Sequence, residues 1–223
     1  LAIVFTLFLI APSWGSVVNG YYTVGQDWSK MKSNYLTKFF VLGITFYGLQ
    51  TVQGPTQALR VVSQLIHYTD WVPGHVHMGT MGWVTLVVTA SIYYVIPKIH
   101  GTEIYSVRLA NAHFWLALVG QLLFSITMWI TGIRQGWMWK ATDAEGRLVY
   151  RNFMDTVTGN YPYWHTRTLA GIIFTAGMLL FVYNVLMTIR KGKALERQAA
   201  SAPAAAPDTL PFKGLGMALA AAA

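Results

Sequence analysis

The sequence predicts an all-α polytopic transmembrane helix bundle with about five membrane spans. Only 11% of the 223 residues are charged, whereas soluble domains average about 25%. The mean hydropathy is +0.42. Apolar runs close to the roughly 20 residues that a spanning helix needs cover residues 1–24, 36–52, 74–96, 110–133 and 169–188. A chain this apolar has little polar surface to face water, so we expect it to reside in a membrane.

The distribution of basic residues predicts the orientation of the bundle. Lys and Arg are more frequent in the segments after the first, third and fifth runs than in those after the second and fourth. The positive-inside rule therefore places the former segments on the cytoplasmic side of the membrane. The long loop 134–167, rich in Trp and Tyr, then faces outward.

The net charge of +8 does not indicate a nucleic-acid partner, because the basic residues lie at the ends of apolar runs. The chain has no Cys, which excludes disulfides, covalent c-type haem attachment and iron–sulfur clusters. Histidine is thus the natural ligand for any metal. The chain starts inside an apolar run that lacks the basic region and cleavage site of a signal peptide, so we expect an upstream segment to be missing.

Two parts are predicted. Residues 1–193 form the transmembrane part, and the Ala/Pro-rich residues 194–223 form a disordered or loosely attached tail without chemistry.

The segment around His75 and His77 carries the strongest chemical signal. Asp70 can cap a helix start, and Pro73 fits its first turn. Residues two apart on a helix point about 200° apart, so the two histidines cannot comfortably share one metal. They can serve two cofactors on opposite faces, and haem iron is often held by an axial His. Gly74, Gly79 and Gly82 could let flat macrocycles approach. The alternative is that both histidines only make hydrogen bonds between helices.

The same segment also resembles a known family. The run His67-Tyr68-Thr69-Asp70-Trp71, followed by Gly74-His75-Val76-His77 and Gly82-Trp83, resembles the tenth helix of the catalytic haem–copper subunit of cbb3-type cytochrome c oxidases. Further matches place residues 1–193 over about helices eight to twelve of that subunit. They are Ala11-Pro12-Ser13-Trp14-Gly15, Asn19-Gly20, Phe46-Tyr47-Gly48, Gly54-Pro55, Asn111 to Leu116, Gly132, Gly136 to Trp139 and Gly177-Met178.

This resemblance implies a terminal oxidase of the bacterial inner membrane that reduces oxygen to water with coupled proton translocation. Electrons would come from soluble or membrane cytochrome c through membrane-anchored c-type cytochrome subunits. It also implies two haem b groups, with His75 on the high-spin iron and His77 on the low-spin iron. The copper ligands of the family lie on earlier helices, outside this chain, so no catalytic residue is expected in it, and it would need the N-terminal helices of the same subunit.

Other residues are weaker candidates. Gln53 stands where the family usually has a Glu near the proximal His, a change that should tune redox potential. Arg60, His67, Asp70 and Trp71 precede the ligand helix, on an outer loop where haem propionates would emerge, although a solvated loop or helix cap explains Asp70 equally well. Asn19, Tyr21 and Tyr47 could line a proton path, but hydrogen bonds between helices are the commoner role for such residues. His113 is expected to be structural and His165 to lie on the surface.

Two alternative functions remain open. One is a catalytic subunit like that of nitric oxide reductase, which shares the two-haem arrangement. The other is a haem-free transporter or structural subunit, in which polar residues line a substrate path.

Overall fold

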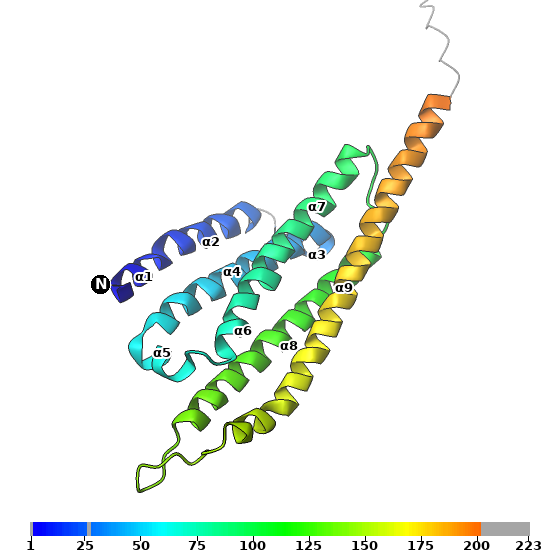
Figure 1. Ribbon diagram of the computed structural model, residues 1–223. Coiled ribbons are helices and arrows are strands. Elements are labelled where there is room, and N and C mark those ends of the chain that lie inside the picture. Colours follow the sequence, from blue (N-terminus) through cyan, green and yellow to red (C-terminus); the bar gives the residue numbers. More distant parts are fainter. Residues whose placement is uncertain (1, 26–27, 202–223) are drawn as a thin grey trace, which may run out of the picture.

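The fold is a bundle of long helices, described for residues 2–25 and 28–201 of a computed structural model (Figure 1). Every element in this part of the chain is helical. The elements are α1 (Ala2–Phe8), α2 (Ile10–Gly25), α3 (Ser29–Ser33), α4 (Tyr35–Ala58), α5 (Arg60–Ile66), α6 (Trp71–His77), the π-helix η1 (Met78–Val84), α7 (Thr85–Ile99), α8 (Val107–Lys140) and α9 (Phe153–Ser201).

Within the described residues, four helical runs are long and apolar enough to cross a membrane: Ile3–Gly25, Trp71–Ile99, Val107–Lys140 and Phe153–Gln198. The predicted all-α membrane bundle is therefore confirmed. Each run contains all or nearly all of one predicted span.

The predicted span 36–52 lies in α4, which is not one of these four runs. With 24 residues, α4 is about 36 Å long at 1.5 Å per residue, so its length is sufficient. Its second half, however, carries Gln50, Gln53 and Gln57, which make it less apolar. Figure 1 shows α4 between α2 and the run α6–α7, and two of these amides bond that run.

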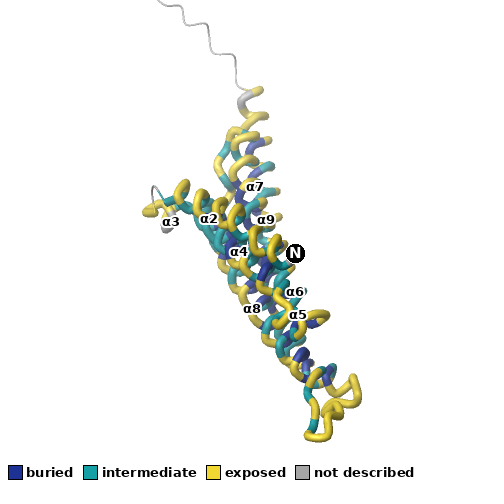
Figure 2. The backbone as a smooth tube through the Cα atoms, turned by 90° about the vertical axis from the view of Figure 1, so that its left-hand side faces the viewer, coloured by how far each residue is buried: buried dark blue, intermediate teal, exposed yellow. Residues whose placement is uncertain are grey.

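The most buried of the four candidate spans is α8, in which buried residues recur from Ala110 to Met138 (Figure 2). It lies side by side with α9 along much of its length, as Figure 1 shows. The main apolar cluster joins α4, η1, α7, α8 and α9 through Phe39, Phe46, Met78, Leu86, Ala90, Tyr93, Ala110, Phe114, Ala117, Phe174 and Phe181.

Polar side chains fix the turn between α7 and α8. Ser106 caps α8 by accepting a hydrogen bond from the Leu109 amide (3.3 Å). Asn184 of α9 bonds both the amide and the carbonyl of Ser106, at 3.0 and 2.9 Å, and Thr188 accepts from the Tyr105 amide at 3.0 Å. Asn184 and Thr188 are buried, and the loop backbone satisfies them.

Several predicted boundaries are wrong. Residues 134–167 are mostly helical, because α8 continues to Lys140 and α9 already begins at Phe153. Only residues 141–152 connect them, closed by one antiparallel bridge between Thr142 and Leu148. Buried contacts explain the extension of α9: Thr156 and Asn160 of its first turns are enclosed by the protein.

The end of the chain differs from the predicted division at 193. Helix α9 continues to Ser201, so the start of the predicted tail is helical. The rest of that tail lies outside the described residues.

Candidate functional site

His75 and His77 lie on α6, and each faces a different neighbouring helix. The Nδ1 atom of His75 lies 3.3 Å from Oε1 of Gln53 on α4, and its ring stacks on Trp71 of its own helix, with centroids 6.1 Å apart. The ring of His77 instead packs against the ring of Phe124 on α8, with ring centroids 4.7 Å apart. The predicted opposite-face geometry is therefore confirmed.

In both histidines the hydrogen bonding leaves Nε2 able to bind a metal. Nδ1 of His77 lies 2.7 Å from the carbonyl oxygen of Pro73. A carbonyl oxygen only accepts hydrogen bonds, so Nδ1 donates. In His75, Nδ1 likewise donates to the amide oxygen of Gln53. A neutral imidazole protonated at Nδ1 presents its lone pair at Nε2, the usual arrangement in histidines that bind metals.

A π-helical segment follows His77 directly. At the end of this segment, η1 (Met78–Val84), the hydroxyl of Thr85, the first residue of α7, donates to the carbonyl of Thr80 at 2.7 Å. On the facing helix, Gln50 accepts a hydrogen bond from the Trp83 indole at 2.7 Å. Short π-helical segments are rare and often occur at functional sites. This one changes the direction of the side chains after His77, which the sequence pattern did not predict.

The glycines of this run serve helix packing, so the prediction that they admit macrocycles is wrong. A Cβ at Gly74 would lie 2.9 Å from Met128 Cβ of α8. A Cβ at Gly82 would lie 3.1 Å from the Phe46 ring of α4, and one at Gly79 would collide with Gln50. Protein atoms already fill these spaces.

Open space lies beside His75 instead. A pocket of about 320 Å³ is lined by residues of α1, α2, α4 and α6. Its lining comprises Thr6, Leu9, Ser13, Gln50, Thr51, Gly54, Pro55 and His75. Hydroxyl and amide groups therefore share this space with the imidazole.

Asp70, at the start of α6, is held by two other helices. Its backbone amide donates to Oε1 of Gln135 at 2.7 Å, and Nε2 of Gln135 donates back to its carboxylate at 3.0 Å. The indole of Trp164 on α9 donates to the same carboxylate oxygen at 2.6 Å. The predicted helix-cap role is wrong, because the Asp70 side chain makes no cap bond. Sequence reasoning missed Gln135 and Trp164, since nothing in the sequence links residues so far apart.

Comparison with known proteins identifies the family. The profile of the family described as Cytochrome C and Quinol oxidase polypeptide I matches residues 1–173. The chain belongs to this oxidase family.

The similarity of this oxidase chain to individual proteins supports the same family assignment. It is 42% identical over 202 residues to the Cbb3-type cytochrome c oxidase subunit CcoN1 of Stutzerimonas stutzeri, covering 90% of this chain and 42% of that protein. It is 37% identical over 205 residues to cytochrome c oxidase subunit 1 of Rhodobacter capsulatus, covering 92% and 38%. The predicted resemblance to the cbb3-type subunit is confirmed. The chain spans about two fifths of the length of these relatives.

The fold of the oxidase chain also matches a solved structure. A heme-copper terminal oxidase dimer seen by cryo-EM superposes with a TM-score of 0.64 at 21% identity, over 84% of this chain and 36% of that one. This similarity establishes the shared fold.

The residues predicted near haem propionates are only partly brought together. Arg60 opens α5, so it is not on a loop as predicted, and it is exposed. His67 follows α5, is exposed, and packs edge-on against Tyr68 with ring centroids 4.0 Å apart. Asp70 and Trp71 are half-buried at the start of α6. Among the described residues, no group of three or more His, Cys, Asp or Glu side chains could hold a metal ion.

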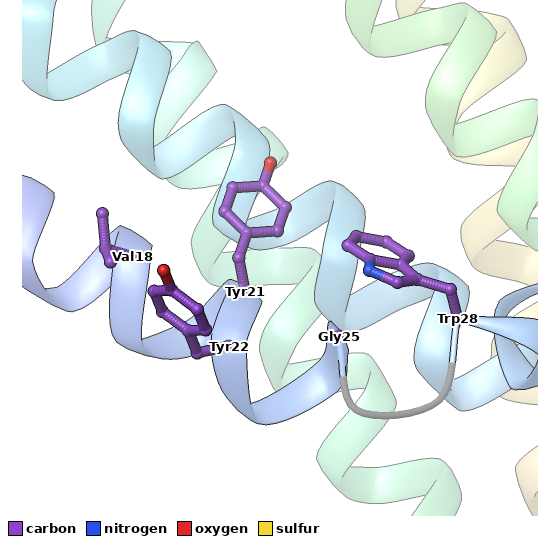
Figure 3. A pocket seen from close by; sticks show the side chains of 5 residues that line it. All are labelled: Val18, Tyr21, Tyr22, Gly25 and Trp28. Carbon is purple, nitrogen blue, oxygen red and sulfur yellow. The ribbon is translucent and has the colours of Figure 1, made fainter.

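The three residues predicted for a proton path are not joined by hydrogen bonds. Tyr21 bonds the Thr45 hydroxyl at 2.6 Å, the Tyr47 ring packs against Trp83 at 4.9 Å, and Asn19 is exposed. Figure 3 shows Tyr21 and Trp28 beside a pocket of about 520 Å³ at the end of α2. In the structure, Tyr21 therefore joins α2 to α4, and Tyr47 joins α4 to η1.

Two further histidines considered in the sequence analysis, His113 and His165, lie apart from α6. His113 is buried among the rings of Phe39, Tyr93 and Phe181, and its Nδ1 lies 3.3 Å from the Tyr93 hydroxyl. This is the structural environment that the sequence predicted. His165 is exposed, on α9 rather than on the predicted loop.

Proposed function

We propose that this chain is the haem-ligating C-terminal part of the catalytic subunit of a cbb3-type terminal oxidase in a bacterial inner membrane. The whole subunit would reduce oxygen to water with electrons from c-type cytochromes and with coupled proton translocation. The observation that carries the proposal is the pair of histidines on opposite faces of α6, each with Nδ1 engaged and Nε2 available.

His75 and His77 would hold two different haem b irons, high-spin and low-spin respectively. Their donor chemistry fits this role, because neutral imidazole nitrogen is a common axial ligand of haem iron. The haems, when bound, would supply the redox chemistry, and the copper ligands would come from helices outside this chain. The other residues orient the ligands: Gln53 accepts the Nδ1 proton of His75, and the Pro73 carbonyl accepts that of His77.

The remaining candidates have supporting roles. Arg60 and His67 are exposed near the ligand helix and could donate hydrogen bonds to propionate carboxylates. Trp71 supports the imidazole of His75 by stacking. Partner subunits would be the membrane-anchored c-type cytochromes and the N-terminal helices of the same subunit.

A reduced-minus-oxidised visible spectrum of the purified complex, with metal analysis, tests the proposal. We expect the absorption of two b-type haems in the catalytic subunit and one copper per complex. A complex that contains this chain but no b-type haem would contradict the proposal and would favour a haem-free transporter.

Gln53 should tune the high-spin haem through His75. A carboxylate accepts the Nδ1 proton more strongly than an amide and gives the imidazole more imidazolate character, which stabilises ferric iron. We therefore expect Gln53→Glu to lower the midpoint potential of the high-spin haem, while the potential of the low-spin haem moves less because His77 faces α8. A redox titration of both haems measures this.

Gln57, on the same helix but without a hydrogen bond to either His, provides the matched control. Gln57→Glu should leave the high-spin potential nearly unchanged. An unmoved or raised potential in Gln53→Glu would show that the contact with His75 has no electronic role.

A further inference from the structure

The first turn of α6 is attached to α8 and α9 through one small group of residues. On α8, Gly132, Gln135 and Gly136 follow the i, i+3, i+4 spacing and share one face. A Cβ at Gly132 would collide with the backbone of Trp71, and one at Gly136 with the carbonyl oxygen of Leu65. The segment before the ligand helix therefore lies directly on the α8 backbone.

Polar contacts fix the position of this segment along α8. Gln135 is buried and makes reciprocal hydrogen bonds with the amide and the carboxylate of Asp70. Trp164 adds a bond to the same carboxylate from α9. Hydrogen bonds to an ionised acceptor are shorter and stronger than those between neutral groups, and the 2.6 Å distance from Trp164 agrees with this.

The two histidines depend on this attachment to different degrees. His77 faces α8 through Phe124, and its Nδ1 bond to Pro73 lies in the turn that Asp70 begins. His75 faces α4, where Gln53 supports it. A shift of α6 relative to α8 would therefore change the surroundings of His77 more than those of His75.

We propose that Gln135 and Trp164, acting through Asp70, are positioning residues for the haem ligand His77. This inference rests on the proposed function. We call the hydrogen-bonded group of Asp70, Gln135 and Trp164 the latch. The latch fixes the axial position and the rotation of α6 relative to α8 and α9. The latch holds the His77 imidazole in the orientation that an axial ligand needs.

Trp164→Phe tests the latch while keeping an aromatic ring in place. The variant loses the N–H donor to Asp70, so we expect the electron paramagnetic resonance g-values of the low-spin haem to shift or broaden. Its midpoint potential should move as well, and the high-spin haem should change less. Gln135→Glu, which replaces a donor with a second carboxylate, should change the low-spin signal further.

Trp139→Phe is the matched control. The Trp139 indole donates to Thr156 across the same α8–α9 interface at 3.2 Å, and its ring packs against Phe153 of α9 rather than bonding Asp70. A general loss of interface stability would affect both Trp variants alike, whereas the latch predicts a haem signal change only in Trp164→Phe.

The outcomes separate the latch from the proposed function. Suppose that the wild-type complex shows the low-spin haem. If the g-values and potential of this haem in Trp164→Phe and Gln135→Glu equal those of the wild type and of Trp139→Phe, the latch is refuted and the haem assignment stands. If the wild-type complex has no low-spin haem, the proposed function itself fails.

Discussion

Replacing His77 with Ala should abolish the low-spin haem b signal and leave part of the high-spin signal. Replacing His75 with Ala should do the reverse. The reason is geometric: His75 contacts α4 and His77 contacts α8, so one haem cannot easily use both. Removing an axial ligand leaves the iron without its protein bond on that side. Haem content per complex and low-temperature visible spectra of both variants measure the loss.

His165→Ala is the control for these variants. His165 is exposed on α9, and its replacement should leave both signals at the wild-type level. If His75→Ala and His77→Ala lost the same signal, the two side chains would serve one cofactor and the opposite-face interpretation would be wrong.

The sequence predicted the parts of this structure that depend on local pattern. Apolar runs predicted the helices because a spanning helix satisfies its own backbone and presents apolar side chains. The two-residue spacing of His75 and His77 predicted their opposite faces, because both lie on a regular α-helix. The burial of His113 among aromatic rings agrees with its predicted structural role. A His without a ligand partner at useful spacing most often packs in a core.

The failures concern contacts between segments distant in sequence. Gln135 and Trp164 meet Asp70 across 65 and 94 residues, and no local pattern encodes that meeting. Gly74 and Gly79 suggested cofactor space, but a neighbouring helix fills each position. Residues 134–167 were predicted to form one long loop, yet α8 continues to Lys140, and α9 begins at Phe153 with Thr156 and Asn160 buried in its first turns.

Gly132→Ala should strongly weaken the packing of α6, the proposed haem-ligand helix, on α8. A Cβ at this position would lie 2.6 Å from Trp71 Cα and would collide with the Trp71 amide nitrogen. The obstacle is backbone, which cannot rotate away as a side-chain end can, so α6 must move away from α8. Adding a methyl group to a tightly packed site typically costs about 1–3 kcal/mol. A shift of α6 would also stretch the bonds of Asp70 to Gln135.

We therefore expect Gly132→Ala to lower both the thermal stability of the complex and its low-spin haem content. Gly171→Ala is the matched control, because Gly171 also lies inside a long helix but a Cβ there would meet nothing within 4 Å. Ala is favoured over Gly in a helix by roughly 0.5–1 kcal/mol, so this control should be neutral or slightly stabilised. Thermal unfolding with haem quantification compares the two. Equal stability and haem content in both variants would mean that α6 can leave α8 without consequence, and that the close contact at Gly132 does not position the ligand helix.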